Sequence, residues 1–174
     1  MAASTTSSNS PSTAPKKPVV NLDSATVRFC GDSGDGMQLA GGQLSSTSAL
    51  LGNDVATFPD FPAEIRAPRG TKAGVSGFQV HFASTDIFTP GDRVDAMVAM
   101  NPAALVTNLT DLVPGGVLIV NKNAFDDKDL KKAGYEHNPL DDGSLESYQL
   151  FAVEMTKLTR LAVKDQGLGV KESD

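Results

Sequence analysis

The 174-residue sequence is poor in the residues that most often hold metals, clusters and disulfides. It contains one cysteine, Cys30, two histidines, His81 and His137, and no tryptophan. A single cysteine cannot form an internal disulfide or ligate an iron–sulfur cluster by itself, and neither histidine has further ligands at a spacing that suits zinc. The sequence therefore predicts no metal site in this chain. Cys30 follows an apolar run and precedes glycines, and we interpret it as a buried spacer rather than a nucleophile.

Basic residues and long apolar runs are also scarce. Lysine and arginine total 15 against 21 aspartate and glutamate residues, which gives a formal net charge of −6. An acidic chain argues against a broad nucleic-acid surface, which needs clustered Lys and Arg. No apolar run approaches the roughly 18 residues that a membrane-spanning helix needs, so the sequence predicts no membrane segment. The apolar share of 40% is instead typical of a soluble globular domain.

The chain divides into an arm and one domain. Residues 1–18 are rich in Ser, Thr, Ala and Pro and carry almost no apolar bulk, so this arm is predicted to be disordered. It has neither the hydrophobic core of a secretory signal nor the arginine that is usual in a transit peptide, which favours a cytoplasmic protein. Residues 19–174 are long enough to bury one core and are predicted to form a single domain.

Short apolar strands alternate with helical patterns through this domain. Strands are predicted at residues 25–30, 55–58, 77–83, 95–100, 117–120 and 150–153, and helices at 37–51, from Pro102 onwards and at 156–165. Asn101 and Pro102 are typical of a helix N-cap and a first helical residue. Residues 114–116 are predicted to form a turn, and residues 123–148 an irregular insertion. The alternation predicts an α/β, Rossmann-like three-layer sandwich with a mostly parallel sheet.

Two of the predicted elements carry informative side-chain patterns. In the helix at 37–51, Gly41 and Gly42 each cost about 1 kcal/mol relative to alanine, which indicates a close backbone approach to something else, with a frayed helix as the alternative. In the strand at 77–83, Gln79 and His81 alternate with apolar residues, so this strand is predicted to be half buried with its polar side chains toward water. The apolar face of the helix is predicted to hold Met37, Ala40, Leu44 and Leu51.

A glycine loop joins the first predicted strand to the first predicted helix. It reads Gly31-Asp32-Ser33-Gly34-Asp35-Gly36. Backbone N–H groups between a strand and a helix N-terminus can bind an anion, but this spacing is neither the dinucleotide fingerprint nor a P-loop. The two aspartates repel a phosphate and favour the helix N-terminus instead. Two readings stay open, an anion-binding loop and, favoured by the residues alone, a tight structural turn.

A basic segment follows the second predicted strand. Residues 61–77 read FPAEIRAPRGTKAGVSG and place Arg66, Arg69 and Lys72 close together in an acidic chain. Arginine matches carboxylates and phosphates with a fixed fork of donors, and Thr71 and Ser76 add short donors. A long loop in a compact domain is usually functional or disordered. The segment is predicted to recognise an anion or an interface, with a solvated loop as the alternative.

Several of these features are predicted to meet at one edge of the sheet. The glycine loop, Asn101 and the pair Asn121-Lys122 each follow a predicted strand. Ligands of such sheets bind beyond the carboxyl ends of the strands. Because the basic segment also follows a strand and is long, it is able to reach the same edge.

The glycine loop and the basic segment, in this order, resemble the gamma domain of 2-oxoacid:ferredoxin oxidoreductases. FCGDSGDGMQLAGGQL is similar to the opening of that domain, and FPAEIRAPRGTKAGVSGFQVHF is similar to the segment that follows it. DAMVAMNPAAL, DLVPGGVLIVN and MTKLTRLAVKD resemble its later portions, so the resemblance covers about residues 25–174. The FPAEIRAP form is most similar to the 2-oxoglutarate or broad 2-oxoacid branch, in which the gamma domain is fused to the front of a longer alpha subunit.

The resemblance implies a reaction that this chain cannot perform alone. The family oxidatively decarboxylates a 2-oxoacid with coenzyme A to an acyl-CoA, CO₂ and reduced ferredoxin, using thiamine diphosphate and iron–sulfur clusters. It implies that partner alpha and beta subunits or domains hold these cofactors. The chain stops where the fused subunit would continue, so we expect a fragment of the fused form, truncated at its C-terminus, with a truncated reading frame or a free-standing gamma subunit as the alternatives. By the same resemblance, the residues that face the substrate or coenzyme A region are Arg66, Arg69, Thr71, Ser76 and Asn101, and those that hold the neighbouring loop are Gly31, Ser33, Gly34 and Gly36.

Two alternatives belong to other functional classes. A stand-alone Rossmann-like nucleotide-binding domain would use the glycine loop, although the loop spacing argues against it. A purely structural interface module would use the basic segment for assembly and contact no ligand. No side chain is predicted to be a catalytic acid, base or nucleophile.

Overall fold

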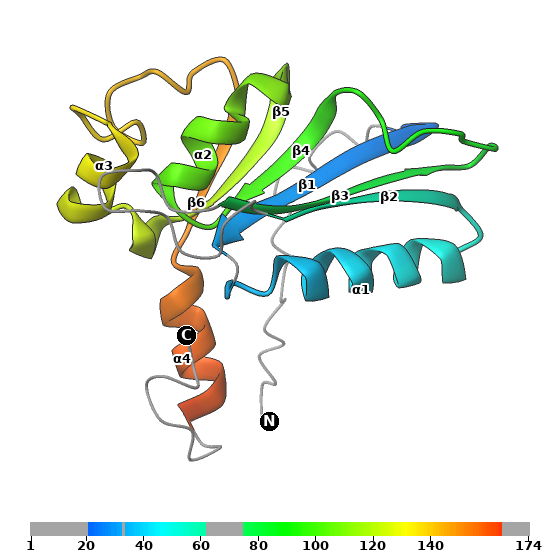
Figure 1. Ribbon diagram of the computed structural model, residues 1–174, viewed down its shortest axis with the longest axis horizontal. Helices are drawn as coiled ribbons and strands as arrows, with labels where there is room; N and C mark the ends of the chain where they lie inside the picture. Colours follow the sequence, from blue (N-terminus) through cyan, green and yellow to red (C-terminus); the bar gives the residue numbers. More distant parts are fainter. Residues whose placement is uncertain (1–20, 33, 62–74, 165–174) are drawn as a thin grey trace, which may run out of the picture.

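The computed structural model describes residues 21–32, 34–61 and 75–164. Within these ranges the chain forms one sheet with helices packed on it (Figure 1). The strands are β1 (Ser24–Asp32), β2 (Asp54–Asp60), β3 (Val75–Ala83), β4 (Val94–Ala99), β5 (Leu112–Asn121) and β6 (Gln149–Val153). The helices are α1 (Met37–Leu50), α2 (Pro102–Asn108), α3 (Asp127–Ala133) and α4 (Met155–Val163), with the short 3-10 turns η1 (Leu109–Asp111) and η2 (Lys122–Ala124).

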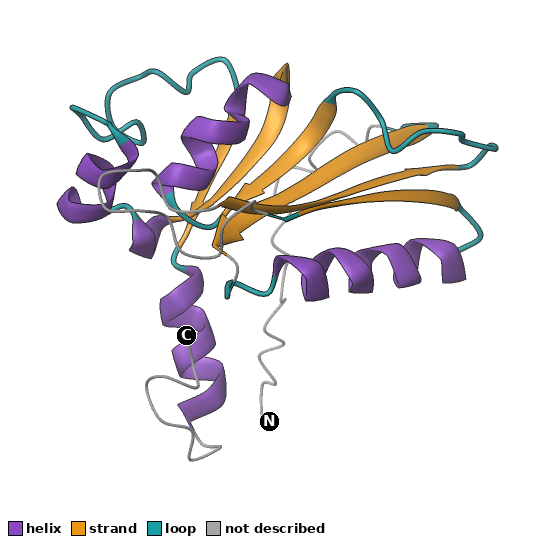
Figure 2. Ribbon diagram, in the orientation of Figure 1, coloured by secondary structure: helices purple, strands orange, loops and turns teal. Residues whose placement is uncertain are grey.

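A single sheet of six strands organises the domain, in the order β2-β3-β1-β4-β5-β6. β1, β4, β5 and β6 are parallel neighbours, whereas β3 runs antiparallel to both β1 and β2. α1 packs on β1, β2 and β3 from one face, and α2 packs on the other face (Figure 2). The predicted α/β, Rossmann-like fold with a mostly parallel sheet is therefore confirmed. Among the described helices, none combines the length and apolar character needed to cross a membrane.

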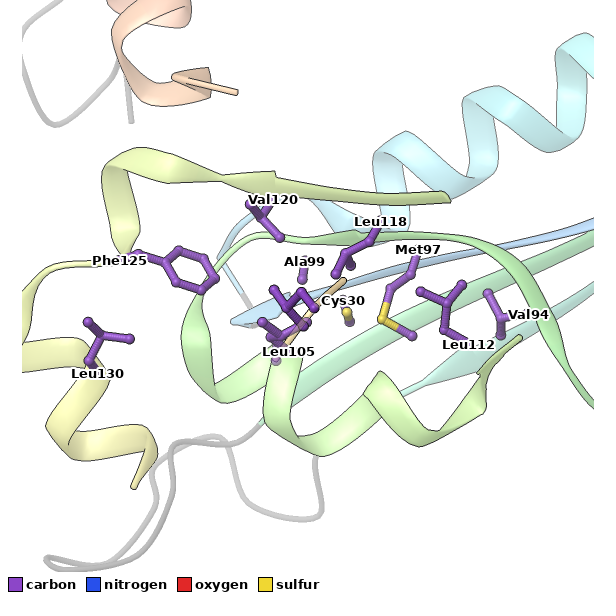
Figure 3. Packing of buried hydrophobic residues seen from close by; sticks show 12 residues of the cluster. Cys30, Val94, Met97, Ala99, Leu105, Leu112, Leu118, Val120, Phe125 and Leu130 are labelled. Atoms are coloured by element: carbon purple, nitrogen blue, oxygen red, sulfur yellow. The ribbon is translucent and has the colours of Figure 1, made fainter. Parts of the chain in front are cut away.

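The main core lies between the sheet and the helices α2 and α3 (Figure 3). Met97 of β4, Leu118 of β5 and Leu105 of α2 are fully buried there. The Cys30 thiol donates to the carbonyl oxygen of Val98 at 3.3 Å, and burial raises the pKa of this thiol to about 12. Cys30 is therefore the buried spacer that its sequence context predicts, and it stays protonated at neutral pH.

The polar face predicted for the strand at 77–83 is not exposed at Gln79, which belongs to a group of hydrogen-bonded polar side chains. Arg28 of β1 donates to Gln79 Oε1 at 2.7 and 3.0 Å and to Asn108 Oδ1 at 3.2 Å, and it forms an ion pair with Asp111. Gln79 is buried and donates to two carbonyl oxygens of the loop that follows β3. The prediction that Gln79 faces water is wrong, because a buried amide is tolerated when its hydrogen bonds are satisfied.

The predicted turn at residues 114–116 is wrong, and the predicted irregular insertion is right only for residues 134–148, which form neither helix nor strand. Residues 114–116 continue β5, whose register with β4 shifts near its start, the kind of irregularity at which a sheet accepts a proline. Residues 123–148 contain α3 and bury Phe125, Leu130 and Leu145 in the core. Their apolar residues are spaced too widely to form a recognisable helical or strand period, so this part of the core could not be predicted from the sequence.

Helix α1 packs closely against β3 at a glycine, Gly41. A Cβ atom at Gly41 would lie 2.1 Å from Phe78 Cδ1, so a side chain at this position would hold the helix away from β3. The close approach predicted from the two glycines is confirmed for Gly41 and is wrong for Gly42, where an added Cβ would meet nothing within 4 Å. Leu51, predicted on the buried face of the helix, is 78% exposed.

Replacing Gly41 with alanine is expected to destabilise the chain by about 1–3 kcal/mol, because overpacking forces either the helix or Phe78 to shift. Gly42→Ala is the matched control and is expected to raise stability by up to about 1 kcal/mol through helix propensity. Urea denaturation of the two purified variants measures both free energies of unfolding. Equal stability of the two alanine variants would contradict the close contact between α1 and β3.

Candidate functional site

A cavity of about 270 Å³ lies at the carboxyl ends of the parallel strands. The loop after β1, Asn101 after β4 and Asn121 at the end of β5 all border it, so the three segments predicted to meet at this edge do meet. The first turns of α4 and part of α3 complete its wall. The described lining residues are Asp32, Asp35, Met100, Asn101, Asn121, Ala124, Asp129, Met155, Thr156 and Thr159.

The glycine loop is a turn closed by its own carboxylate. Asp35 Oδ2 accepts the Asp32 N–H at 2.8 Å, and the Asp35 N–H donates to the Asp32 carbonyl oxygen at 3.0 Å. A Cβ atom at Gly31 would lie 2.6 Å from Asp35 Oδ2, which accounts for glycine there. Gly36 precedes α1 with a φ of 74°, a conformation that favours glycine. Because Asp35 occupies an N–H group that an anion would need, the geometry supports the structural-turn reading.

Asn101 links this turn to α2. Its Oδ1 accepts the Ala104 N–H at 2.8 Å and Pro102 follows at the first helical position, which confirms the predicted N-cap. The Asn101 Nδ2 group donates to Asp32 Oδ1 at 3.1 Å. One side-chain amide therefore fixes both the start of a helix and the orientation of a carboxylate beside the cavity.

A second asparagine fixes the start of α4. Asn121 is buried, donates from Nδ2 to Thr156 Oγ1 at 3.1 Å and accepts the Thr156 N–H at 3.5 Å. Asn123 Oδ1 accepts the Lys157 N–H at 3.2 Å, whereas the N-cap residue Glu154 makes no capping side-chain bond. The sequence marks Asn121 by its place after a buried strand. It does not reveal Thr156, because the two residues are 35 positions apart.

The cavity is acidic. Asp32, Asp35 and Asp129 line it, and its described lining residues include no lysine or arginine. Burial raises the pKa of the Asp35 carboxyl, and the nearby Asp32 charge raises it further, against the lowering effect of the hydrogen bond from the Asp32 backbone. Lys132 offsets one of these charges through its ion pair with Asp129, whereas the carboxylates of Asp32 and Asp35 still repel a phosphate or carboxylate unless further positive charge is supplied.

The described residues do not fit the two cofactors that the family resemblance implies. An iron–sulfur cluster needs several thiolates, and the one cysteine of the sequence is buried. The diphosphate of thiamine diphosphate needs positive charge or a metal ion. In the parts of the chain that the structure describes, no group of 3 or more His, Cys, Asp or Glu side chains is arranged to hold a metal.

The basic segment is anchored beside the glycine loop. Four predicted site residues lie outside the described ranges, namely Ser33, Arg66, Arg69 and Thr71. The strand pairing places both ends of the segment. Asp60, which precedes it on β2, pairs with Gly77 of β3, and Ser76 of β3 pairs with Gly31 of β1. Ser76 is buried and donates from Oγ to the Asp60 carbonyl oxygen at 3.4 Å. Its predicted contact with a substrate or coenzyme stays a prediction.

These features define a Rossmann-like α/β domain with a polar cavity at the carboxyl edge of its parallel strands. The chain belongs to the pyruvate ferredoxin/flavodoxin oxidoreductase family, which it matches over residues 26–169. It is 53% identical over 151 residues to the 2-oxoglutarate oxidoreductase subunit KorA of Mycobacterium tuberculosis, a match that covers 87% of this chain and 23% of KorA.

Solved structures share the fold. The 2-oxoglutarate:ferredoxin oxidoreductase from Magnetococcus marinus matches with a TM-score of 0.62 and 25% identity, over 83% of this chain and 22% of that chain. The keto/oxoacid ferredoxin oxidoreductase gamma subunit from Geobacter sulfurreducens matches with a TM-score of 0.57 and 20% identity, over 87% of this chain and 71% of that chain. This chain therefore spans less than a quarter of KorA and of the Magnetococcus chain.

The raised pKa of the Asp35 carboxyl predicts a pH-dependent stability that Asp35→Asn removes. Because the pKa of Asp35 is raised in the folded chain, the folded state binds the proton more tightly than the unfolded state does. The native protein should therefore gain stability relative to Asp35→Asn as the pH falls through the raised pKa, and the gain is complete below the ordinary value of 3.8. Urea midpoints measured between pH 7 and pH 4 give this difference.

Asp35→Ala serves as the control for the hydrogen bond. Asparagine keeps an oxygen for the Asp32 N–H, whereas alanine leaves that donor without its partner and should cost about 1 kcal/mol at every pH. A difference between the native chain and Asp35→Asn that stays constant with pH would contradict the assignment of a raised pKa to this carboxyl.

Proposed function

We propose that this chain is the gamma-type domain of a 2-oxoacid:ferredoxin oxidoreductase that acts on 2-oxoglutarate, at the front of a fused alpha subunit. The observation that carries the proposal is the 53% identity to a 2-oxoglutarate oxidoreductase subunit, over 87% of the chain. The Magnetococcus marinus enzyme, solved with 2-oxoglutarate, coenzyme A and succinyl-CoA bound, supports it with a shared fold at 25% identity.

The assembled enzyme would convert a 2-oxoacid and coenzyme A to an acyl-CoA, CO₂ and reduced ferredoxin in the cytoplasm. Carbanion chemistry and electron transfer in this reaction belong to thiamine diphosphate and iron–sulfur clusters. The thiamine-binding alpha and beta subunits or domains of the same complex are the proposed holders of both cofactors, because the described residues offer neither a set of thiolates nor a positively charged cavity. We assign no catalytic acid or base to this chain.

The proposed role of this chain is to complete the region where the substrate and coenzyme A bind. The basic segment starts and ends at the edge of the sheet that carries the glycine loop, and Ser76 near its end pairs with Gly31. This position supports a role for Arg66 and Arg69 in offsetting the carboxylates of that loop so that an anion can approach. Thr71 and Ser76 would add short donors. Asn101 would contribute by holding Asp32, to which it donates a hydrogen bond.

In the assembled enzyme, Arg66→Ala is expected to lower kcat/KM for 2-oxoglutarate or coenzyme A roughly 10- to 100-fold, because a charge-assisted hydrogen bond contributes about 1.5–3 kcal/mol. Arg93→Ala is the matched control, since Arg93 is exposed just before β4 at the amino end of the sheet, and its kinetics should equal those of the native enzyme. The measurement is ferredoxin reduction that depends on both 2-oxoglutarate and coenzyme A.

Three outcomes separate the parts of this proposal. Turnover of pyruvate with no use of 2-oxoglutarate would overturn the substrate assignment. Identical kinetics of the Arg66 and Arg93 variants would remove the role of the basic segment and leave assembly as its function. Tight binding of NAD by the isolated chain, measured by calorimetry, would favour a stand-alone nucleotide-binding domain instead.

A further inference from the structure

The outer face of helix α1 has no partner within the described parts of the chain. α1 packs on β1, β2 and β3 with its inner face, where Met37, Gly41 and Ser48 are buried, and Figure 1 shows no described helix or strand on its outer side. Leu39 and Leu50 on that outer face are 67% and 88% exposed. Helices that carry large apolar side chains away from their packed face are normally covered there as well, so a partner for this face is expected.

This outer face is uncharged in an otherwise acidic chain. None of the 14 residues of α1 is Asp, Glu, Lys or Arg, whereas 21% of the whole chain is charged. With a formal net charge of −6, two copies of the chain repel each other wherever their carboxylates meet. The outer face of α1 brings no charge to a contact, so two copies can meet there without that repulsion.

The outward side chains follow a two-fold pattern along the helix. Leu39, Gln43, Ser46 and Leu50 are separated by four, three and four positions, the spacing that keeps side chains on one side of a helix. The pairs equally distant from the middle of the helix are Leu39 with Leu50, Gly42 with Thr47, and Gln43 with Ser46. In a two-fold contact, residue i meets residue j and j meets i, so this pattern matches itself when the second helix runs antiparallel.

We propose that the chain forms a two-fold dimer in which α1 packs antiparallel against α1 of a second copy. Leu39 packs against the partner's Leu50 at both ends of this contact, and Gln43 reaches the partner's Ser46 at its centre. An added Cβ at Gly42 would meet nothing within 4 Å, so the backbone there is open to close approach by the other helix. The polar pair fixes the register, and the antiparallel direction sets the positive end of each helix dipole beside the negative end of the other.

The contact is small, so the dimer is expected to be weak. One helix of 14 residues from each copy buries less than the roughly 1,600 Å² of a standard specific interface. A dissociation constant of about 1–100 µM is therefore expected. The dimer needs neither substrate nor cofactor, and it holds whether or not the chain acts on 2-oxoglutarate.

Leu39→Asp and Leu50→Asp test the dimer in the 174-residue chain. Each places a carboxylate in the apolar part of the contact and should raise the dissociation constant at least roughly tenfold, as measured by sedimentation equilibrium. Leu22→Asp is the matched control, because Leu22 is 66% exposed just before β1, at the opposite edge of the sheet from Leu39. The control should leave the dissociation constant unchanged.

Cysteine pairs test the direction of the helices. With both Leu39→Cys and Leu50→Cys in one chain, each new thiol faces the partner's other new thiol, and mild oxidation should give a covalent dimer. Either cysteine alone should give none, because 11 positions along antiparallel helices set the two copies of that residue about 16 Å apart, whereas a disulfide needs Cα atoms within about 7 Å. The native Cys30 is buried and does not compete.

Three outcomes would overturn the dimer. A native chain that sediments as a monomer up to about 0.5 mM, well above the expected dissociation constant, would leave the outer face of α1 to another part of a longer polypeptide. A dimer that both aspartate variants retain would place the contact elsewhere on the chain. A covalent dimer from Leu39→Cys alone would show parallel helices and contradict the two-fold pairing. Thermal melting of the dilute variants checks that each still folds, as expected for exposed positions.

Discussion

The pairing of β1 with an antiparallel strand on one side and a parallel strand on the other decides where the described candidate residues lie. Because β3 is antiparallel to β1 and β2, β2 ends and β3 begins at the edge where β1 ends, so Ser76 pairs with Gly31 and Asp60 pairs with Gly77 one strand further out. Because β4 is parallel to β1, Asn101 follows it at that edge and reaches Asp32. A parallel β3 would have sent the two flanks to opposite edges of the sheet.

Local signals predicted the elements well, and tertiary partners explain where they failed. Apolar runs indicated the strands and the Asn101-Pro102 pair indicated the start of α2, because both signals act through neighbouring residues. Gln79 looked exposed because its partner Arg28 lies 51 positions away. The segment at 123–148 looked irregular because the core that buries Phe125 and Leu130 is assembled from distant strands. Neither of these long-range contacts produces a periodic pattern in the sequence.

The position of the candidate site was predictable, whereas its charge balance was not. Topology brings the ends of parallel strands together, so the loop after β1, Asn101 and Asn121 were placed correctly. The hydrogen bond from the Asp32 N–H to Asp35 and the hydrogen bond between Asn121 and Thr156 depend on the backbone geometry of the folded chain. The spacing of these residues along the sequence does not reveal either bond. The same geometry makes the described cavity acidic, so an anionic ligand needs cations from outside its described lining.

Helix α4 forms one wall of the acidic cavity. Its Thr156 and Thr159 line the cavity, while Leu158 and Leu161 on another side of the helix face solvent. Asn121 and Asn123 hold its first turn, and because the helix continues without a break to Val163, they also place Thr159 at the cavity. One wall of the cavity is therefore set by two asparagines that follow β5, and its shape depends on how firmly they hold the start of α4.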